Sequence, residues 1–268
     1  MSVDAETGVV LVRDNGVLHI GLNRPHRKNA LDATAVRTII EALEAAAVDD
    51  ELRVVVIEGS GGHFCSGADW VASNTGERRR PRTGSVQRRT ALQAHRLIQL
   101  VTEVQLPVVC VVTGYAAGLG CQLALAADFT IAAESARIWE PFLDRGFSPD
   151  SGATWLLPRL VGIARAKELL MLGRELSGTE AEAWGLIHRA VPDAQLTATA
   201  DELVAKLGSA ATVAMGLTKR AVNRGLELGL VEAMEHEAYA LELSSRTADF
   251  KEGLAAFKER RVPRFEGR

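Results

Sequence analysis

Several features that would assign a chain to a common class are missing from these 268 residues. The three cysteines are odd in number and show no C-x-x-C spacing, which argues against a disulfide framework and favours reduced, packed thiols in a cytosolic protein. No apolar run reaches the roughly 18 residues of a membrane-spanning helix, and the polar, acidic segment Met1–Glu6 has no signal-peptide pattern. We therefore expect a cytoplasmic protein with no membrane partner.

An excess of charge of one sign is also lacking, because 31 basic and 34 acidic side chains leave a formal net charge of −3. Such a balance gives no reason to expect nucleic acid as a partner. The six histidines show no H-E-x-x-H or clustered ligand spacing, so we expect no metal site. No motif pairs a histidine with Ser66, Ser148 or Ser151, which argues against a Ser-His-Asp protease.

A glycine-rich stretch joins an apolar strand to an apolar helix. Val108–Val112 is a run of β-branched and small residues that predicts a buried strand, and Gln122–Ala127 predicts a buried helix. Between them the spacing G-x-x-x-G-x-G, from residue 114 to residue 120, matches neither nucleotide-binding fingerprint. Backbone amides at such a turn can bind an anion, although tight strand-helix packing without chemistry explains the glycines equally well.

A second glycine-rich turn, residues 59–70, follows another apolar strand at Val54–Ile57. If the two turns converge, backbone N–H groups from both can point at one oxygen and form an oxyanion hole without side chains. Either turn alone is weak support for that interpretation.

The N-terminal half predicts an α/β core. Val9–Val12 and Val17–Leu22 alternate around Asp14-Asn15-Gly16, which is typical of a β-hairpin. Asp32 is placed to cap a helix whose apolar residues fall on one face, and the next strand follows that helix. A strand, a helix and a strand in this order favour parallel pairing with a right-handed crossover.

The rest of the chain is mostly helical by its periodicity. A basic segment, residues 73–89, is either a solvated loop running into a helix or a phosphate-binding lid. A helix carrying Leu92, Leu97 and Leu100 follows, and a strand is expected at Phe129–Ala133. We expect a core over residues 1–190 and a helical part over 191–268. The further helices are expected at 164–172, 179–184, 196–207, 212–227, 230–243 and 249–260, with a short strand at 187–191.

Four motifs occur in a fixed order: N-R-P-x-x-x-N-A-L at 23–31, F-C-S-G-A-D at 64–69, G-Y-A-A-G-x-G-C at 114–121 and P-R-L-V-G at 158–162. With these motifs the whole chain resembles the crotonase family, also called the enoyl-CoA hydratase/isomerase superfamily. The resemblance implies an α/β spiral of repeated ββα units with a helical C-terminal trimerisation part, in which trimers often pair into hexamers. It also implies chemistry on acyl-CoA thioesters, with coenzyme A as part of the substrate and no tightly bound cofactor.

Carried over position by position, the resemblance places the oxyanion hole on the backbone N–H groups of Ala68 and Leu119, in the two turns described above. It also implies a set of substrate-binding residues, of which the last two would reach coenzyme A at a subunit boundary. They are Arg27, Lys28, Ala30, Asp69, Trp70, Val71, Gln122, Phe142, Phe257 and Arg260, where the family often has lysine at the position of Arg260.

The chain departs from the family at the two glutamates with which a hydratase holds and deprotonates water. Gln122 and Phe142 occupy those positions. An amide cannot act as a base and a phenyl ring excludes water, so hydration by two carboxylates is in doubt.

Asp150 matches the position of the catalytic aspartate in some isomerases and a dehalogenase of the family. Beside Phe142 and Phe147 its carboxylate would be partly desolvated, which suits it to moving a proton. We hypothesise that Asp150 shuttles a proton between the α and γ carbons of an unsaturated acyl-CoA, giving double-bond isomerisation. The structural alternative is an aspartate that caps a helix from Ala153.

Other activities stay open at this point. They are enoyl-CoA hydration despite the two replacements, dehalogenation with Asp150 as a nucleophile on an aryl ring, and acyl-CoA binding without catalysis. Glu140 and Asp144 are lesser candidates for the catalytic acid, and we interpret them as surface acids.

Overall fold

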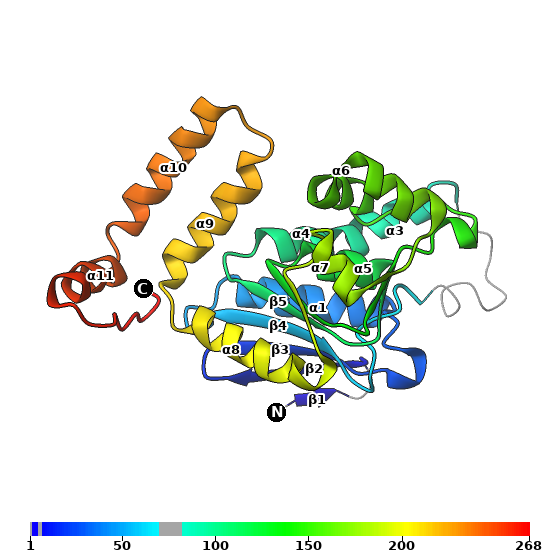
Figure 1. Ribbon diagram of the computed structural model, residues 1–268, viewed down its shortest axis with the longest axis horizontal. Helices are drawn as coiled ribbons and strands as arrows, with labels where there is room; N and C mark the ends of the chain where they lie inside the picture. Colours follow the sequence, from blue (N-terminus) through cyan, green and yellow to red (C-terminus); the bar gives the residue numbers. More distant parts are fainter. Residues whose placement is uncertain (1, 5–6, 70–81) are drawn as a thin grey trace.

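The structure, a computed structural model, describes residues 2–4, 7–69 and 82–268 (Figure 1). In these residues a seven-stranded sheet forms the base of the core, in the order β1-β2-β3-β4-β5-β7-β10. Its first three strands pair antiparallel, and the strands from β3 onward pair parallel. The strands are β1 (Ser2–Asp4), β2 (Val9–Asp14), β3 (Val17–Leu22), β4 (Val54–Gly59), β5 (Val108–Val112), β7 (Phe129–Ala133) and β10 (Arg189–Val191).

A smaller sheet holds β6 (Tyr115–Ala117), β8 (Arg137–Trp139) and β9 (Leu176–Ser177). The chain alternates between the sheets, so that β5, β6 and α5 (Leu119–Ala126) form one ββα unit and β7, β8 and α6 (Ala153–Leu172) form the next. This alternation confirms the predicted α/β fold of repeated ββα units. It also shows a short strand, β6, inside the stretch that the sequence predicted as a turn.

Local signals explain the N-terminal elements. The hairpin turn between β2 and β3 has positive φ at Asn15 (47°) and Gly16 (78°), as the predicted tight turn requires. Asp32 caps α1 (Ala33–Ala46), because its Oδ1 accepts hydrogen bonds from the N–H groups of Thr34 at 3.0 Å and Ala35 at 2.9 Å. Helix α1 buries Val36, Ile39 and Leu43 and packs against α4 (Ala94–Glu103).

Two predicted helices differ from the structure. The helix through Leu92 is interrupted at Gln93 (φ −120°, ψ −95°), so α3 (Ser85–Leu92) and α4 are separate and Leu92 is 77% exposed. The helix expected at 164–172 is present, but a second helical segment that starts at Ala153 precedes it, and the two meet at a non-helical kink at Gly162 (φ 76°, ψ 165°) within α6.

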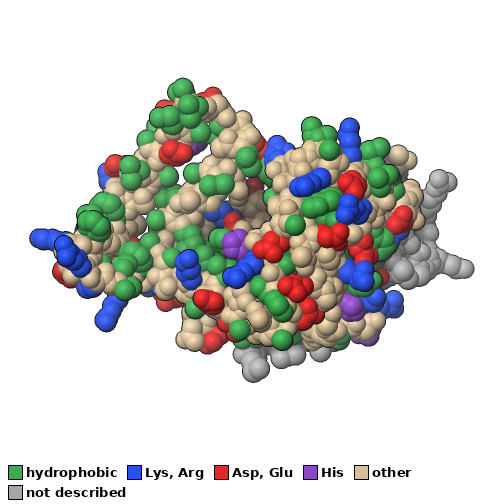
Figure 2. All heavy atoms as spheres, in the orientation of Figure 1, with side chains coloured by type: hydrophobic (Ala, Val, Ile, Leu, Met, Phe, Trp, Pro, Cys, Tyr) green, Lys and Arg blue, Asp and Glu red, His purple; other side chains and the backbone are tan. Residues whose placement is uncertain are grey.

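The C-terminal helices lie apart from the small sheet. Helix α8 (Leu196–Gly208) packs against β4, β5 and β7, whereas α9 (Thr212–Gly225) and α10 (Leu230–Ser244) pair with each other and stand away from the sheet (Figure 1). Hydrophobic side chains are scattered over the surface of this α9–α10 arm (Figure 2). The remaining helices are α7 (Gly178–Ala183) and α11 (Ala248–Glu259).

Candidate active site

The two glycine-rich turns lie against each other. A β-bridge joins Cys65 in the first turn to Ala116 in the second. Gly67 has a φ of +100°, and a Cβ atom added to it would lie 2.8 Å from the carbonyl oxygen of Ala117 and 3.5 Å from the amide nitrogen of Leu119. This close approach is possible because Gly67 has no side chain. The structure therefore confirms that the turns converge.

The backbone N–H groups of Ala68 and Leu119 are left without partners in the part of the chain that the structure describes. Leu31 donates to the carbonyl of Gly67 at 2.8 Å and accepts from the N–H of Asp69 at 2.8 Å, so the Ala68 N–H points away from Leu31. Leu119 is the first residue of α5, where an N–H has no partner within the helix. The geometry leaves one amide from each turn available to a ligand.

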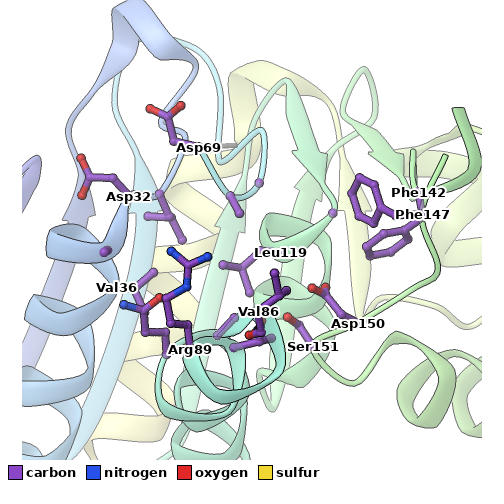
Figure 3. A pocket seen from close by; sticks show the side chains of 18 of the residues that line it. Asp32, Val36, Asp69, Val86, Arg89, Leu119, Phe142, Phe147, Asp150 and Ser151 are labelled. Carbon is purple, nitrogen blue, oxygen red and sulfur yellow. Dashed lines mark hydrogen bonds between the residues drawn. The ribbon is translucent and has the colours of Figure 1, made fainter. Parts of the chain in front are cut away.

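Both residues line a cavity of about 450 Å³. Its walls come from the start of α1, from the two turns, from α3 and from the segment after β8. Figure 3 shows Asp32 and Asp69 toward one end of this cavity and Asp150 toward the other. The lining residues on which the chemistry depends are Gly67, Ala68, Leu119, Phe142, Phe147 and Asp150.

Asp150 is partly buried and lines the cavity. Burial raises the pKa of the Asp150 carboxyl above its ordinary range, against the opposing effects of the Ser151 hydroxyl and of His95. Phe142 and Phe147 contact each other edge to face, with ring centroids 5.5 Å apart, and both line the same cavity. Helix α6 has Gly152 as its N-cap and no side-chain cap, so the helix-capping alternative for Asp150 is wrong.

Two of the three carboxylates that line the cavity are held by one guanidinium. Arg24 contacts Asp32 at 3.2 Å and Asp69 at 3.1 Å, and Asp69 is 6% exposed. Among the described residues no lysine or arginine forms an ion pair with Asp150. Asp150 is therefore the acid of the cavity whose charge is least neutralised by the protein.

Glu140 corrects a prediction, because it is 1% exposed and not a surface acid. The Nε2 of Gln122 donates to both carboxylate oxygens of Glu140, at 2.8 Å each. Neither residue is among those that line the cavity, so the proposed substrate contact of Gln122 stays a prediction. Asp144 is exposed, as predicted.

The spacing of apolar residues could have identified Glu140 as buried. Apolar residues lie on both sides of Glu140 in the run Ile138–Phe142, where Ile138, Glu140 and Phe142 are 2%, 1% and 4% exposed. Its acidic character alone led to the wrong prediction.

The expected coenzyme A loop lies beside the cavity, not in its lining. Arg27 and Lys28 are exposed, and the Nζ of Lys28 lies 4.5 Å from the centroid of the Tyr115 ring. The carbonyl of Ala30 accepts from Arg24 at 2.8 Å. Trp70 and Val71 lie outside the described residues.

Phe257 and Arg260 do not reach this cavity within one chain. Phe257 is 86% exposed at the end of α11, and Arg260 is the exposed residue that follows this helix. Figure 1 shows α11 at the opposite end of the molecule from α3 and α6. Any contact with a ligand bound in the cavity would come from another copy of the chain.

Over residues 2–4, 7–69 and 82–268 the structure holds no helix long and apolar enough to cross a membrane. In the same residues no group of three His, Cys, Asp or Glu side chains is placed to hold a metal ion.

Comparison with known proteins identifies the family. A sequence model described as Enoyl-CoA hydratase/isomerase matches residues 12–268. The chain is 38% identical over 259 residues to 1,2-epoxyphenylacetyl-CoA isomerase of Escherichia coli (strain K12), covering 95% of this chain and 97% of that protein. It is 31% identical over 260 residues to 2,3-dehydroadipyl-CoA hydratase of the same organism, covering 97% and 99% of the two chains.

The crystal structure of an enoyl-CoA hydratase from Bacillus anthracis is similar, with a TM-score of 0.89 and 32% identity over 97% of this chain and 100% of the other. The chain therefore belongs to the enoyl-CoA hydratase/isomerase family and has the crotonase fold.

Proposed function

We propose that this member of the family moves the double bond of an unsaturated acyl-CoA. One observation carries the proposal: a single cavity is lined by Ala68, Leu119 and Asp150, which offer two free amides and a carboxylate without a lysine or arginine partner in the described chain. These groups match the two needs of the reaction, which are to stabilise negative charge on oxygen and to move a proton at carbon.

In this mechanism the thioester oxygen accepts hydrogen bonds from the N–H groups of Ala68 and Leu119. The Asp150 carboxylate removes a proton from the α carbon of a 3-enoyl group, and the electron pair spreads over the resulting dienolate. The protonated Asp150 then returns the proton to the γ carbon, which leaves the double bond between the α and β carbons. Each amide donor is worth about 3 kcal/mol of barrier reduction.

The surroundings of Gln122 and Phe142 favour isomerisation over hydration. Gln122 is fully buried against Glu140, and Phe142 packs on Phe147, so neither position supplies a carboxylate to the cavity. The similarity to 1,2-epoxyphenylacetyl-CoA isomerase of E. coli supports isomerisation of an acyl-CoA, although that protein's name refers to an epoxide and not to a double bond. Hydratases are also among the relatives, which makes hydration the competing activity to measure.

The proposal extends to the bound substrate and to the assembly. Coenzyme A would enter as part of the substrate, not as a tightly bound cofactor, and lie along the loop of Arg27, Lys28 and Ala30. Phe257 and Arg260 would reach it from a neighbouring copy in a trimer or a hexamer. We place this activity in the cytoplasm.

The test is to incubate the pure protein with a 3-enoyl-CoA and with a 2-enoyl-CoA and to follow the absorbance of the conjugated thioester. We expect the 3-enoyl-CoA to gain conjugation. Asp150→Asn should lower kcat by about 10² to 10⁴-fold, because it removes the group that moves the proton. Binding of a saturated acyl-CoA should be unchanged.

Asp144→Asn is the matched control, since it removes an exposed acid from the same segment, and it should keep wild-type activity. Clear hydration of the 2-enoyl-CoA without isomerisation would contradict the proposal. A fully active Asp150→Asn variant would remove Asp150 from the mechanism. Acyl-CoA binding without any turnover would identify a non-catalytic member.

A further inference from the structure

A buried acid behind the cavity wall has no role in the mechanism above. Glu140 follows β8 directly, and its carboxyl contacts the side chain of Gln122 in the first turn of α5. Leu119, at the start of that helix, carries one of the two free amides, and Pro141 and Phe142 next to Glu140 line the cavity. The contact therefore joins the element that presents the amide to the segment that leads to Asp150.

The second contact between these elements comes from the backbone. The N–H of Gly118 donates to the carbonyl of Trp139 at 3.0 Å, directly before α5 and directly before Glu140. The side-chain pair and the backbone bond fix the turn and the segment at adjacent points. Loss of the side-chain pair would leave the backbone bond and the pairing of β6 with β8 as links between the two segments.

The surroundings of Glu140 determine whether its carboxyl group is neutral or ionised. Among the described residues no lysine, arginine or histidine forms an ion pair with it, and the groups that act on it are Cys121, Gln122 and Asp150. Burial raises the pKa of the Glu140 carboxyl to about 8, the thiol of Cys121 and the amide of Gln122 oppose this, and the charge of Asp150 adds to it. A buried carboxylate without a cation is costly, so the neutral acid is favoured near neutral pH.

The Gln122 amide suits the neutral acid as well as the ionised one. Its nitrogen is 2.8 Å from both oxygens of Glu140, and its Oε1 is buried without a partner. Rotating the amide by half a turn exchanges its nitrogen and oxygen, which the two orientations of an amide permit. Without rotation, the Nε2–H still donates to the carbonyl oxygen of the neutral carboxyl; with it, Oε1 can accept the carboxyl proton.

We propose that Glu140 is a positioning residue of the proposed isomerase: as a neutral acid paired with Gln122, it holds the Leu119 amide in register with Asp150. The inference rests on the proposed function. If Glu140 ionises, its charge lies in the first turn of α5, where it competes with the enolate for the positive end of the helix. The charge of Asp150 also acts on Glu140, and Asp150 is influenced in turn by His95 of α4. Ionisation should therefore slow the reaction.

The experiment compares kcat, KM and the pH profile of Glu140→Gln, Glu140→Leu and the wild type. Glu140→Gln keeps the shape and neutrality of the pair, so its kcat at pH 7 should stay within about threefold of the wild type. The wild type should lose kcat as the pH rises through about 8, and Glu140→Gln should not. Glu140→Leu removes the pair and should lower kcat by about 10²-fold with little change in KM, as expected for a small misplacement of a catalytic group.

Glu134→Gln is the control, because it neutralises an exposed acid near the same strand and should match the wild type at every pH. An alkaline loss of kcat that is unchanged in Glu140→Gln overturns the inference, and so does wild-type kcat in Glu140→Leu. If Glu140→Leu does not fold, the dependence of kcat on pH in Glu140→Gln and the wild type is enough to test the inference. A wild type that isomerises no substrate overturns the proposed function and the inference with it, whereas active variants indistinguishable from Glu134→Gln overturn only the inference.

Discussion

At the scale of single residues, Gly67 decides how closely the two turns approach. A methyl group at this position would lie 2.8 Å from the carbonyl oxygen of Ala117, and the φ of +100° disfavours any side chain. We expect Gly67→Ala to lower the free energy of unfolding by about 1–3 kcal/mol, the cost of a residue held in an unfavourable backbone region. Because the turns must then separate, isomerase activity should fall as well.

Comparison with Gly146→Ala distinguishes backbone strain from the contact with Ala117 as the cause of lost activity. Gly146 has a φ of +73°, and a Cβ there meets nothing within 4 Å. The control therefore carries the backbone strain without the contact. Chemical denaturation and isomerase assays of both variants measure the difference, and equal activity in the two would show that the contact with Ala117 does not set the geometry of the amides.

The buried Glu140 makes stability depend on pH. Its pKa is about 8 in the folded protein, above the ordinary 4.5 that holds when the chain is unfolded. The folded state therefore binds the Glu140 proton more tightly than the unfolded chain does. The resulting contribution to the free energy of unfolding is complete below pH 4.5 and is lost as the pH rises toward about 8. Within this window the loss is about 1 kcal/mol per pH unit.

Glu140→Gln has no proton to lose, so it should become more stable relative to the wild type as the pH rises from 5 to 8. Urea denaturation of both proteins at several pH values measures this difference, and titrations that other groups contribute cancel in the comparison. A difference that does not change with pH would show that Glu140 is not held as a neutral acid.

Individual residues also show what the sequence could predict. Glycine spacing indicated the two turns because it reports local backbone geometry, whereas Ala68 and Leu119 were assigned within them by the resemblance to the family. The apolar residues around Glu140 indicate burial, but its partner, Gln122, is 18 positions away and belongs to a different element, so their contact could not be predicted. Pairing between distant side chains leaves no local pattern in one sequence.

At the scale of elements, Lys219 fixes α9 to the core. Its Nζ donates to the carbonyls of Val101 at 2.8 Å and Leu106 at 3.1 Å and contacts the carboxylate of Asp128 at 2.7 Å. Its side chain is 7% exposed. Lys219→Met leaves Asp128 without this cation, so we expect unfolding to become easier by about 3 kcal/mol.

Lys206→Met is the control for Lys219→Met, because Lys206 is an exposed lysine on α8. Guanidinium denaturation of both variants measures the effect. Equal midpoints in the two variants would contradict a stabilising role for the contact with Asp128.

The elements themselves follow from local signals more reliably than their boundaries do. The cap at Asp32 and the turn at Gly16 were predicted because both depend on neighbouring residues. The break at Gln93 and the helical segment of α6 that precedes the kink at Gly162 depend on how these helices pack, which periodicity does not show. Helix α3 forms part of the cavity wall. For the same reason, this wall could not be placed from the sequence.

At the scale of the whole molecule, the α9–α10 arm exposes more apolar surface than is usual for a monomeric protein (Figure 2). Leu230, Val231 and Met234 on α10 are 77%, 79% and 57% exposed, and Tyr239 on the same helix is 65% exposed. Phe257 beyond the arm is 86% exposed. An assembly that covers this surface could also bring Phe257 and Arg260 to the cavity of another copy.

We therefore expect size-exclusion chromatography with light scattering to give three or six times the 28.8 kDa of one chain. Met234→Glu places a charge within the exposed apolar surface, so it should shift the mass toward that of one chain. Val48→Glu, at a residue 83% exposed beyond the end of α1, should leave the mass unchanged. If Phe257 and Arg260 act across the boundary, Met234→Glu should also weaken acyl-CoA binding, although Met234 lies far from the cavity of its own chain. A wild type that runs as a single chain at micromolar concentration would contradict the assembly, and with it any role for Phe257 and Arg260 at the site.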